Sequence, residues 1–224
     1  KKPDELLGPL NEVERKFAPS ELFLKGNLQL FEEGPRVSIV GSRNPSEQGC
    51  KDTIKLVKSL VKNKVIIVSG LAKGIDTIAH KTAISERGHT IAVLGTSLDD
   101  CYPNENFELQ QIISKDHLAV SQFPEGHLIQ KMNFPLRNRT MALLSHATII
   151  VEAGETSGTI HQGWEALRLG RPLFILNKLI ENPKLSWPKK MINYGAVSIL
   201  VSDIERVLEV LPASGSRIID VALS

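Results

Sequence analysis

The sequence is poor in the residues that mark secreted and membrane proteins. Its 224 residues include two cysteines, Cys50 and Cys101, which form no Cys-x-x-Cys motif and no disulfide framework. That usage is typical of a reducing compartment, so we expect a cytoplasmic protein. The chain also has no apolar run of membrane length and no recognisable signal peptide, so we expect no membrane association.

An excess of charge of one sign is lacking as well. Lys and Arg together number 27 and Asp and Glu number 25, which leaves a formal net charge of +2. Such a balance creates no overall field that would attract a polyanion. Any binding of nucleic acid must therefore come from a local basic patch.

Several catalytic signatures are missing. No Gly-x-Gly-x-x-Gly follows the first predicted strand and no Gly-x-x-x-x-Gly-Lys-Ser/Thr occurs, which argues against a dinucleotide oxidoreductase and a P-loop NTPase. Asp76 and His80 lie one helical turn apart, but no third metal ligand accompanies them. We expect Asp76 to cap a helix and His80 to be a hydrogen-bonded packing residue. The sequence therefore predicts no catalytic residue, no metal and no cofactor.

Short apolar segments alternate with helix-like segments along most of the chain. Because the apolar segments are hydrophobic on both faces, they predict an α/β fold, a doubly wound and mostly parallel sheet with helices on both faces. The predicted strands cover residues 37–40, 65–68, 90–94, 118–121, 148–151 and 172–176. The predicted helices between them cover residues 47–62, 75–86, 106–114, 136–144 and 159–169.

The two ends of the chain have a different composition from this repeating core. Residues 1–34 are polar and contain three prolines, so we expect an N-terminal extension that wraps the edge of the core domain. Residues 35–211 form that domain, with a loop over 182–190, a last strand over 196–200 and a helix over 203–210. Residues 212–224 are expected to be a C-terminal tail.

Glycines and polar side chains follow the predicted strands at the edge where open parallel sheets bind ligands. Glycines allow a ligand to approach the backbone, and helix N-termini offer amides to anions. Each glycine could instead serve only to turn the chain from strand to helix. Four such loops on one edge, two of them with a cation, favour a phosphate site. Its predicted members are Gly41, Ser42, Arg43, Gly70, Lys73, Gly74, Ser157, Gly158 and Thr159.

A second group of candidates lies in residues 133–139. Arg137 and Arg139 can each grip phosphate oxygens with two donors, and Phe134 can stack on a base. The arginines could instead pair with surface carboxylates at a helix start. Two residues apart, they cannot share one helical face. We therefore expect one to face the ligand and the other to turn inward or towards a carboxylate such as Glu152.

The chain resembles the DNA-processing protein A family, also called Smf. The resemblance runs from about residue 19 to residue 211 and rests on segments 40–43, 68–76, 79–80, 92–96, 102–106, 134–139, 151–153, 157–159 and 195–196. It implies a Rossmann-like, homodimeric protein that binds single-stranded DNA without catalysis. It also implies a role in natural transformation and recombination, with RecA recombinase as the partner that is loaded on the strand. The residues that would contact DNA by this resemblance are Arg43, Lys73, Lys131, Phe134, Arg137 and Arg139, and we add Asn138 between the two arginines.

Two other functions remain open from the residues. Nucleoside-monophosphate phosphoribohydrolases share a Rossmann-like fold, but their Pro-Gly-Gly-x-Gly-Thr-x-x-Glu signature is absent, and Glu165 comes six residues after Thr159 instead of three. The same rim could also serve a sensor of a small nucleotide. Release of a base from a nucleotide would establish the enzyme, and tight nucleotide binding without turnover would support the sensor.

Overall fold

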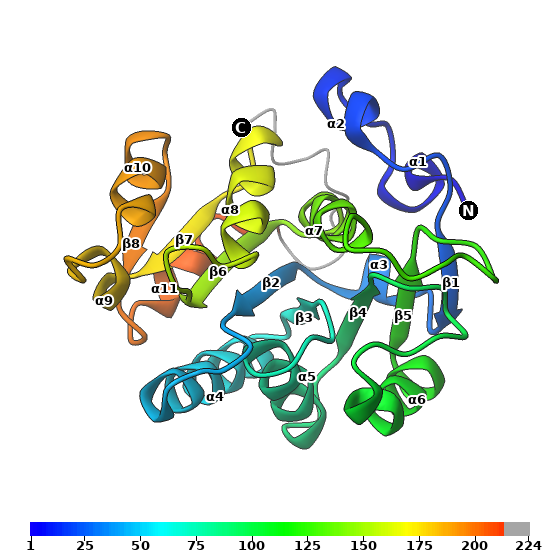
Figure 1. Ribbon diagram of the computed structural model, residues 1–224, viewed down its shortest axis with the longest axis horizontal. Helices are drawn as coiled ribbons and strands as arrows, with labels where there is room; N and C mark the ends of the chain where they lie inside the picture. Colours follow the sequence, from blue (N-terminus) through cyan, green and yellow to red (C-terminus); the bar gives the residue numbers. More distant parts are fainter. Residues whose placement is uncertain (213–224) are drawn as a thin grey trace.

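A computed structural model describes residues 1–212 as one eight-stranded sheet with helices packed on both of its faces (Figure 1). The expected C-terminal tail lies outside the described residues, apart from Pro212. The strands are β1 (Phe23–Gly26), β2 (Arg36–Gly41), β3 (Ile66–Ser69), β4 (Thr90–Leu94), β5 (Leu118–Ser121), β6 (Ala147–Glu152), β7 (Leu173–Leu176) and β8 (Val197–Ile199).

The five α-helices between residues 47 and 168 connect the strands in the order that the sequence pattern predicts. The helices of the described chain are α1 (Pro3–Leu7), α2 (Glu12–Phe17), α3 (Leu30–Glu33), α4 (Glu47–Lys62), α5 (Ile75–Ser85), the 3₁₀ turn η1 (Asn104–Asn106), α6 (Phe107–Asp116), α7 (Asn133–Leu144), α8 (Thr159–Arg168), α9 (Asn177–Ile180), α10 (Trp187–Asn193) and α11 (Ile204–Leu208). Within residues 1–212, no helix is both long and apolar enough to span a bilayer.

The strands follow the order β1-β5-β4-β3-β2-β6-β7-β8. β1 runs antiparallel to β5 and the remaining pairs are parallel. The predicted doubly wound, mostly parallel sheet is therefore confirmed. The sequence pattern missed the four elements in residues 1–34, where β1 extends the sheet at its edge. It also placed a loop where α10 begins, although Pro188 at the second helical position suits the first turn of a helix.

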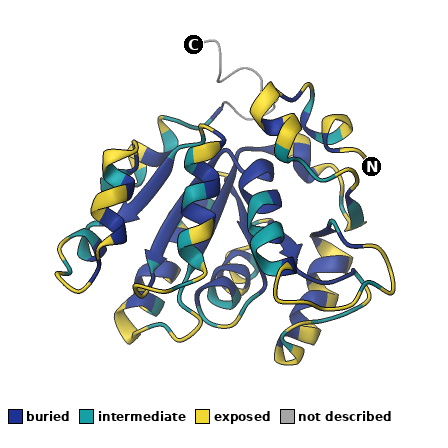
Figure 2. Cartoon of the chain, turned by 45° about the horizontal axis from the view of Figure 1, so that its top comes forward, coloured by how far each residue is buried: buried dark blue, intermediate teal, exposed yellow. Residues whose placement is uncertain are grey.

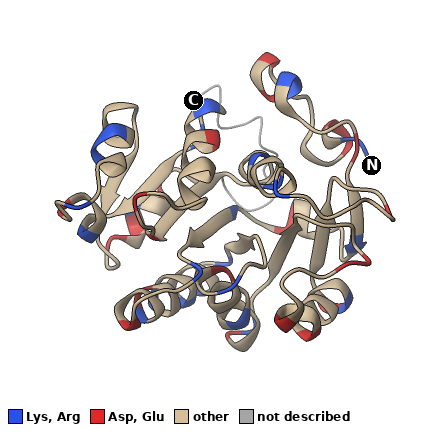
Figure 3. Cartoon of the chain, viewed as in Figure 1, with Lys and Arg blue, Asp and Glu red and all other residues tan. Residues whose placement is uncertain are grey.

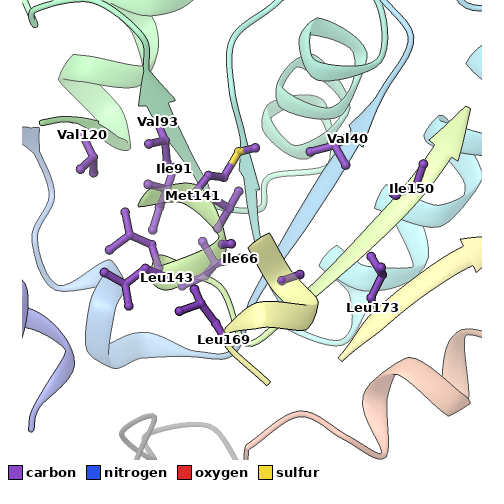
Figure 4. Packing of buried hydrophobic residues seen from close by; sticks show 14 of the residues in the cluster. Val40, Ile66, Ile91, Val93, Val120, Met141, Leu143, Ile150, Leu169 and Leu173 are labelled. Carbon is purple, nitrogen blue, oxygen red and sulfur yellow. The ribbon is translucent and has the colours of Figure 1, made fainter. Parts of the chain in front are cut away.

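Two layers of apolar side chains fill the space between sheet and helices. On one face α4, α5 and α11 pack against residues such as Ile39, Ile67 and Ile149, and α6 covers β4 and β5. On the other face α7, α8, α10 and the N-terminal segment pack against Val40, Ile150 and their neighbours (Figure 4). Strands β2 to β7 are buried along nearly their whole length, whereas the edge strands β1 and β8 are partly exposed and the helices expose one side (Figure 2).

The strand order reverses between β2 and β6. The chain proceeds from β2 to β3, β4 and β5 on one side and then returns to place β6 on the other side of β2. The register of β2 with β6 shifts between Val40 and Gly41, so the pairing is irregular where the two strands end. The loops that follow lead to α4 and α8 on opposite faces of the sheet, which opens a space at this switch point.

Arg36 anchors β2 in the core although it carries a charge. It is 2% exposed, and its Nε donates to the carbonyl of Leu144 at 2.8 Å and its Nη1 to the carbonyl of Phe31 at 2.7 Å. Burial, together with the nearby Arg171, lowers the pKa of Arg36 to about 9, which leaves it charged at neutral pH. One guanidinium thus joins the ends of α7 and α3 to the start of β2.

We expect Arg36→Met to destabilise the fold. The methionine fills similar space but leaves the Phe31 and Leu144 carbonyls without their donor, and each buried unsatisfied acceptor costs about 1–3 kcal/mol. Urea denaturation should give a free energy of unfolding lower by at least about 2 kcal/mol. The matched control is Arg206→Met, at an exposed arginine of α11, which should change that value by less than about 0.5 kcal/mol. Equal unfolding midpoints for the two variants would contradict the anchoring role.

Candidate functional site

A cleft of about 500 Å³ lies at the switch point, between the loops after β2 and β6 and the start of α7. Its volume is within the range of ligand sites. Nine predicted residues line this switch-point cleft: Gly41, Ser42, Arg43, Phe134, Arg137, Asn138, Ser157, Gly158 and Thr159. Gly70 and Lys73 line a smaller pocket of about 40 Å³ that shares Arg43, Ala72, Phe134 and Arg137 with the cleft.

The rim of the cleft is held together by hydrogen bonds to two backbone carbonyls at the end of β2. The amide of Ile75 donates to the carbonyl of Ser42 at 3.1 Å, and Oγ1 of Thr159 donates to the carbonyl of Gly41 at 3.0 Å. Gly74 has a φ of +75°, and a Cβ there would lie 2.4 Å from the Ser42 carbonyl oxygen. Gly74 is therefore a packing residue beneath the rim, because only glycine fits this close approach.

Helix α7 presents one face to the cleft. It begins at Asn133, three residues before the predicted start at residue 136, with Pro135 in its first turn. Phe134, Arg137, Asn138 and Met141 are spaced as one helical stripe, and all four line the cleft. The earlier helix start therefore brings Phe134 onto the same face as Arg137.

Arg137 is buried at the bottom of this face. It is 5% exposed, and its Nη1 donates to the carbonyls of Gly70 and, at 3.0 Å, Val93, which end or follow neighbouring strands. A Cβ on Gly70 would lie 1.8 Å from that nitrogen, so glycine is required beside it. Burial lowers the pKa of Arg137, and the nearby Asp76 opposes that shift.

Asp76 organises the loop that precedes its helix. Its Oδ2 accepts from the amides of Gly70 at 3.1 Å and Ala72 at 3.3 Å. Burial raises the pKa of Asp76, while Arg137 and these amides act against the rise. The prediction that Asp76 caps its helix is therefore wrong, because its carboxylate accepts hydrogen bonds from amides of the loop before α5. His80 is a packing residue as predicted, with Nδ1 2.7 Å from Oγ1 of Thr90.

Arg43 and Phe134 form the exposed part of the site. The guanidinium carbon of Arg43 lies 5.8 Å from the centre of the Phe134 ring, a cation–π distance. Phe134 is half-buried, with its ring against Gly95. Tyr102 extends this aromatic surface: its ring centre is 5.3 Å from that of Phe134 and the residue is 49% exposed. The sequence analysis predicted no role for Tyr102, although residues 102–106 are one of the segments that carry the family resemblance.

The remaining predicted residues do not line the switch-point cleft. Lys73 pairs with Glu105 at the surface, and Lys131 is exposed in the segment before α7 without lining the cleft. Nε of Arg139 lies 3.3 Å from Glu165, and its guanidinium stands over the Phe17 ring at 5.1 Å. The two arginines therefore do face different ways, Arg137 towards the cleft and Arg139 away from it.

The carboxylates beside these arginines differ from the expectation. Arg137 lies near Asp76 and Arg139 pairs with Glu165, whereas Glu152 accepts from the amide of Ser46 at 2.8 Å and from its hydroxyl at 2.5 Å. Glu152 thus fixes the start of α4. Among residues 1–212, no group of three or more His, Cys, Asp or Glu is arranged to hold a metal ion.

The electrostatic character of the cleft is local. Acidic and basic residues are interspersed along the outer helices (Figure 3). The cleft lining combines Arg43 and Arg137 with hydroxyl groups from the Ser42 and Ser157 loops and with the Phe134 ring. Such a surface suits a ligand with a phosphate and a flat ring.

Comparison with known proteins gives a consistent result. The family model for DNA recombination-mediator protein A matches residues 8–212. DNA processing protein DprA of Streptococcus pneumoniae is 46% identical over 159 residues, which cover 71% of this chain and 56% of that protein. DprA of Bacillus subtilis is 36% identical over 194 residues, covering 87% and 65%, and protein Smf of Escherichia coli is 37% identical over 192 residues, covering 85% and 50%.

Solved structures agree with these sequences. The crystal structure of S. pneumoniae DprA has a TM-score of 0.76 at 41% identity, covering 84% of this chain and 66% of that chain. DNA processing protein A from Helicobacter pylori has a TM-score of 0.76 at 29% identity, covering 86% and 88%. The chain spans between half and two thirds of the length of the three sequence relatives named above. With the family model matched over nearly all of its described residues, the chain belongs to the DNA recombination-mediator protein A family, that of the DprA and Smf proteins.

Proposed function

We propose that this chain binds single-stranded DNA in the switch-point cleft and does so without chemical turnover. The observation that carries the proposal is the pairing of Arg43 and Phe134 at the mouth of the cleft, where an exposed guanidinium stands over a half-buried ring. One nucleotide can meet both groups, with its phosphate on the arginine and its base on the ring. H. pylori DNA processing protein A has a single-stranded DNA binding mode, which supports the assignment by family.

The geometry favours an unpaired strand over a duplex. A base can stack on Phe134 only when its own face is free, which a duplex does not offer at this depth. Tyr102 continues the aromatic surface beyond Phe134, and Lys73 lies along the same small pocket. A strand that crosses the mouth of the cleft would therefore meet rings and cations in alternation.

Binding is favoured over base release because the cleft offers no free carboxylate. Among the described lining residues Asp76 is the one acid, and it is buried, bonded to two loop amides and close to Arg137. Glu165, the acid considered for a phosphoribohydrolase, pairs with Arg139 and Arg168 and does not line the cleft. Incubation with nucleoside monophosphates should therefore release no free base.

The family membership extends this proposal to the biological role. We infer action in natural transformation and recombination in the cytoplasm, with RecA recombinase as the partner and a homodimer as the working form. The names of the relatives, which are DNA processing proteins, support the first part. In this proposal residues 35–211 carry the DNA site, and residues 1–34 remain an extension at the edge of the domain.

Arg43→Ala should weaken binding in a salt-dependent way. Each phosphate contact on a single strand contributes about 0.7 to the slope of log affinity against log salt. Titration of labelled oligo-dT across a salt series should therefore show a lower affinity and a slope flatter by about 0.7. Arg206→Ala, at an exposed arginine of α11 that does not line the cleft, is the control and should keep both values. An unchanged slope for Arg43→Ala would mean that Arg43 does not touch phosphate.

Phe134→Leu should weaken binding without changing the salt dependence. Leucine preserves most of the packing against Gly95 but removes the flat ring, and stacking on one base is worth about 1–3 kcal/mol. The expected loss is therefore about fivefold or more, and it should be the same at low and high salt. The variant should melt near the temperature of the unaltered chain, which shows that the loss of affinity is not due to unfolding. Normal affinity in the folded variant would exclude stacking on Phe134.

The two α7 arginines should separate in a stability measurement. Arg137→Met leaves the Gly70 and Val93 carbonyls without their donor and removes the cation near the buried Asp76. Each buried acceptor left unsatisfied costs about 1–3 kcal/mol, so we expect a loss of at least about 2 kcal/mol. Arg139 is 30% exposed in its side chain, so Arg139→Met should cost within about 1 kcal/mol. Urea denaturation of both variants measures the difference. Similar unfolding midpoints would show that Arg137 does not hold the strand ends together.

A further inference from the structure

Gln162 is a buried polar residue whose amide has no partner. It lies on the first turns of α8, four residues after Gly158, and lines the switch-point cleft. The residue is 1% exposed, and within residues 1–212 neither Oε1 nor Nε2 has a hydrogen-bond partner. A buried amide that makes no hydrogen bond destabilises a fold, so such a group calls for an explanation.

The position of Gln162 distinguishes it from the other unpartnered polar groups. Buried side-chain atoms without a partner also occur, in the described part of the chain, at His80, Gln110, His117, Thr148, Arg171 and Trp187. None of these six residues lines the cleft. Gln162 also differs from the other buried glutamine, because Nε2 of Gln110 donates to the carbonyls of Leu98 and Asp100.

We infer that Gln162 hydrogen-bonds the edge of one unpaired nucleobase that enters the cleft. This inference rests on the proposed function and names what the floor of the same site recognises. A carboxamide presents one acceptor and one pair of donors side by side, and base edges present neighbouring donors and acceptors in the complementary arrangement. A phosphate could use the donors but would repel the amide oxygen.

The surroundings of Gln162 suit a base better than a phosphate. Val40 and Met141 line the same cleft and are buried apolar residues, while Phe134 supplies the ring at its mouth. Arg43 is exposed at the mouth of the cleft, and the buried guanidinium of Arg137 already donates to the Gly70 and Val93 carbonyls. Both amide atoms are covered in the free chain, so the side chain must turn about its own bonds to meet the base.

The inference also gives a reason for selection of single strands. The edge that a base offers to Gln162 is engaged with its complement in a duplex, whereas an unpaired base presents it freely. Phosphate contacts at the rim alone would not distinguish the two forms. Stacking on Phe134 and hydrogen bonding to Gln162 would both require an unpaired base.

The test compares Gln162→Met with the unaltered chain on two ligands of equal length. One is a labelled oligodeoxynucleotide with bases, prepared separately as oligo-dA, oligo-dC and oligo-dT, and the other is the abasic deoxyribose-phosphate strand. We expect Gln162→Met to lose about tenfold in affinity for at least one base-bearing strand and to change affinity for the abasic strand by less than about twofold. Because the methionine replaces an unpartnered amide, the melting temperature of the free variant should stay the same or rise.

Gln110→Met is the matched control. It removes an amide that has two partners outside the cleft, so it should lower the melting temperature and leave the ratio between base-bearing and abasic affinities unchanged. Gln162→Leu provides a second apolar replacement in case the methionine variant does not fold. Equal losses on both ligands, or no loss on any of the base-bearing strands, would overturn the role of Gln162.

The same measurements separate this inference from the function on which it rests. If the unaltered chain binds neither strand, the proposed function fails. If it binds all strands and Gln162→Met binds them equally well, single-strand binding stands and base recognition by Gln162 is wrong. A melting temperature that falls in Gln162→Met, with unchanged discrimination between the two ligands, would assign Gln162 to packing.

Discussion

The buried guanidinium of Arg137 is the contact on which the geometry of the cleft depends. It binds the carbonyls of Gly70 and Val93, at the ends of two neighbouring strands, and it lies close to the carboxylate of Asp76. The same carboxylate fixes the amides of the loop before α5. A charge taken from water is costly unless such partners surround it. The result is a helix, α7, whose position relative to the sheet edge is set by hydrogen bonds as well as by apolar packing.

This arrangement divides the basic residues of the site by their surroundings. Arg137 is occupied by protein groups and shapes the cleft, whereas Arg43 is exposed and stands over Phe134. Arg139 serves a third purpose, because it joins α7 to Glu165 of α8 and to Phe17 of the N-terminal segment. A small net charge is sufficient for such a site, since the cations act over a few ångströms and not through a long-range field.

The switch point explains why these residues meet. The loops after β2 and β6 leave the sheet towards opposite faces, and α7 covers the space between them on one side. The cleft is polar at its rim, where Arg43 lies, and aromatic at its mouth, where Phe134 lies. Its floor is apolar and is formed by Val40 and Met141. Gln162 lies at this floor, a buried amide without a partner in the part of the chain that the structure describes. Membership of the DNA recombination-mediator protein A family agrees with a site of this kind.

The sequence by itself determined the order of strands and α-helices from residue 36 to residue 176, the parallel sheet and the candidate rim, because apolar periodicity and glycine-rich loops are local signals. It also indicated that Arg137 and Arg139 face different ways, which follows from helical spacing alone. Only the tertiary structure decided which arginine is buried, since that depends on the carbonyls of strands 44 and 67 residues away in the chain. The roles of Tyr102 and Gln162 were equally beyond the sequence. A buried glutamine and an exposed tyrosine are informative only through what surrounds them, and those neighbours come from distant segments brought together by the fold.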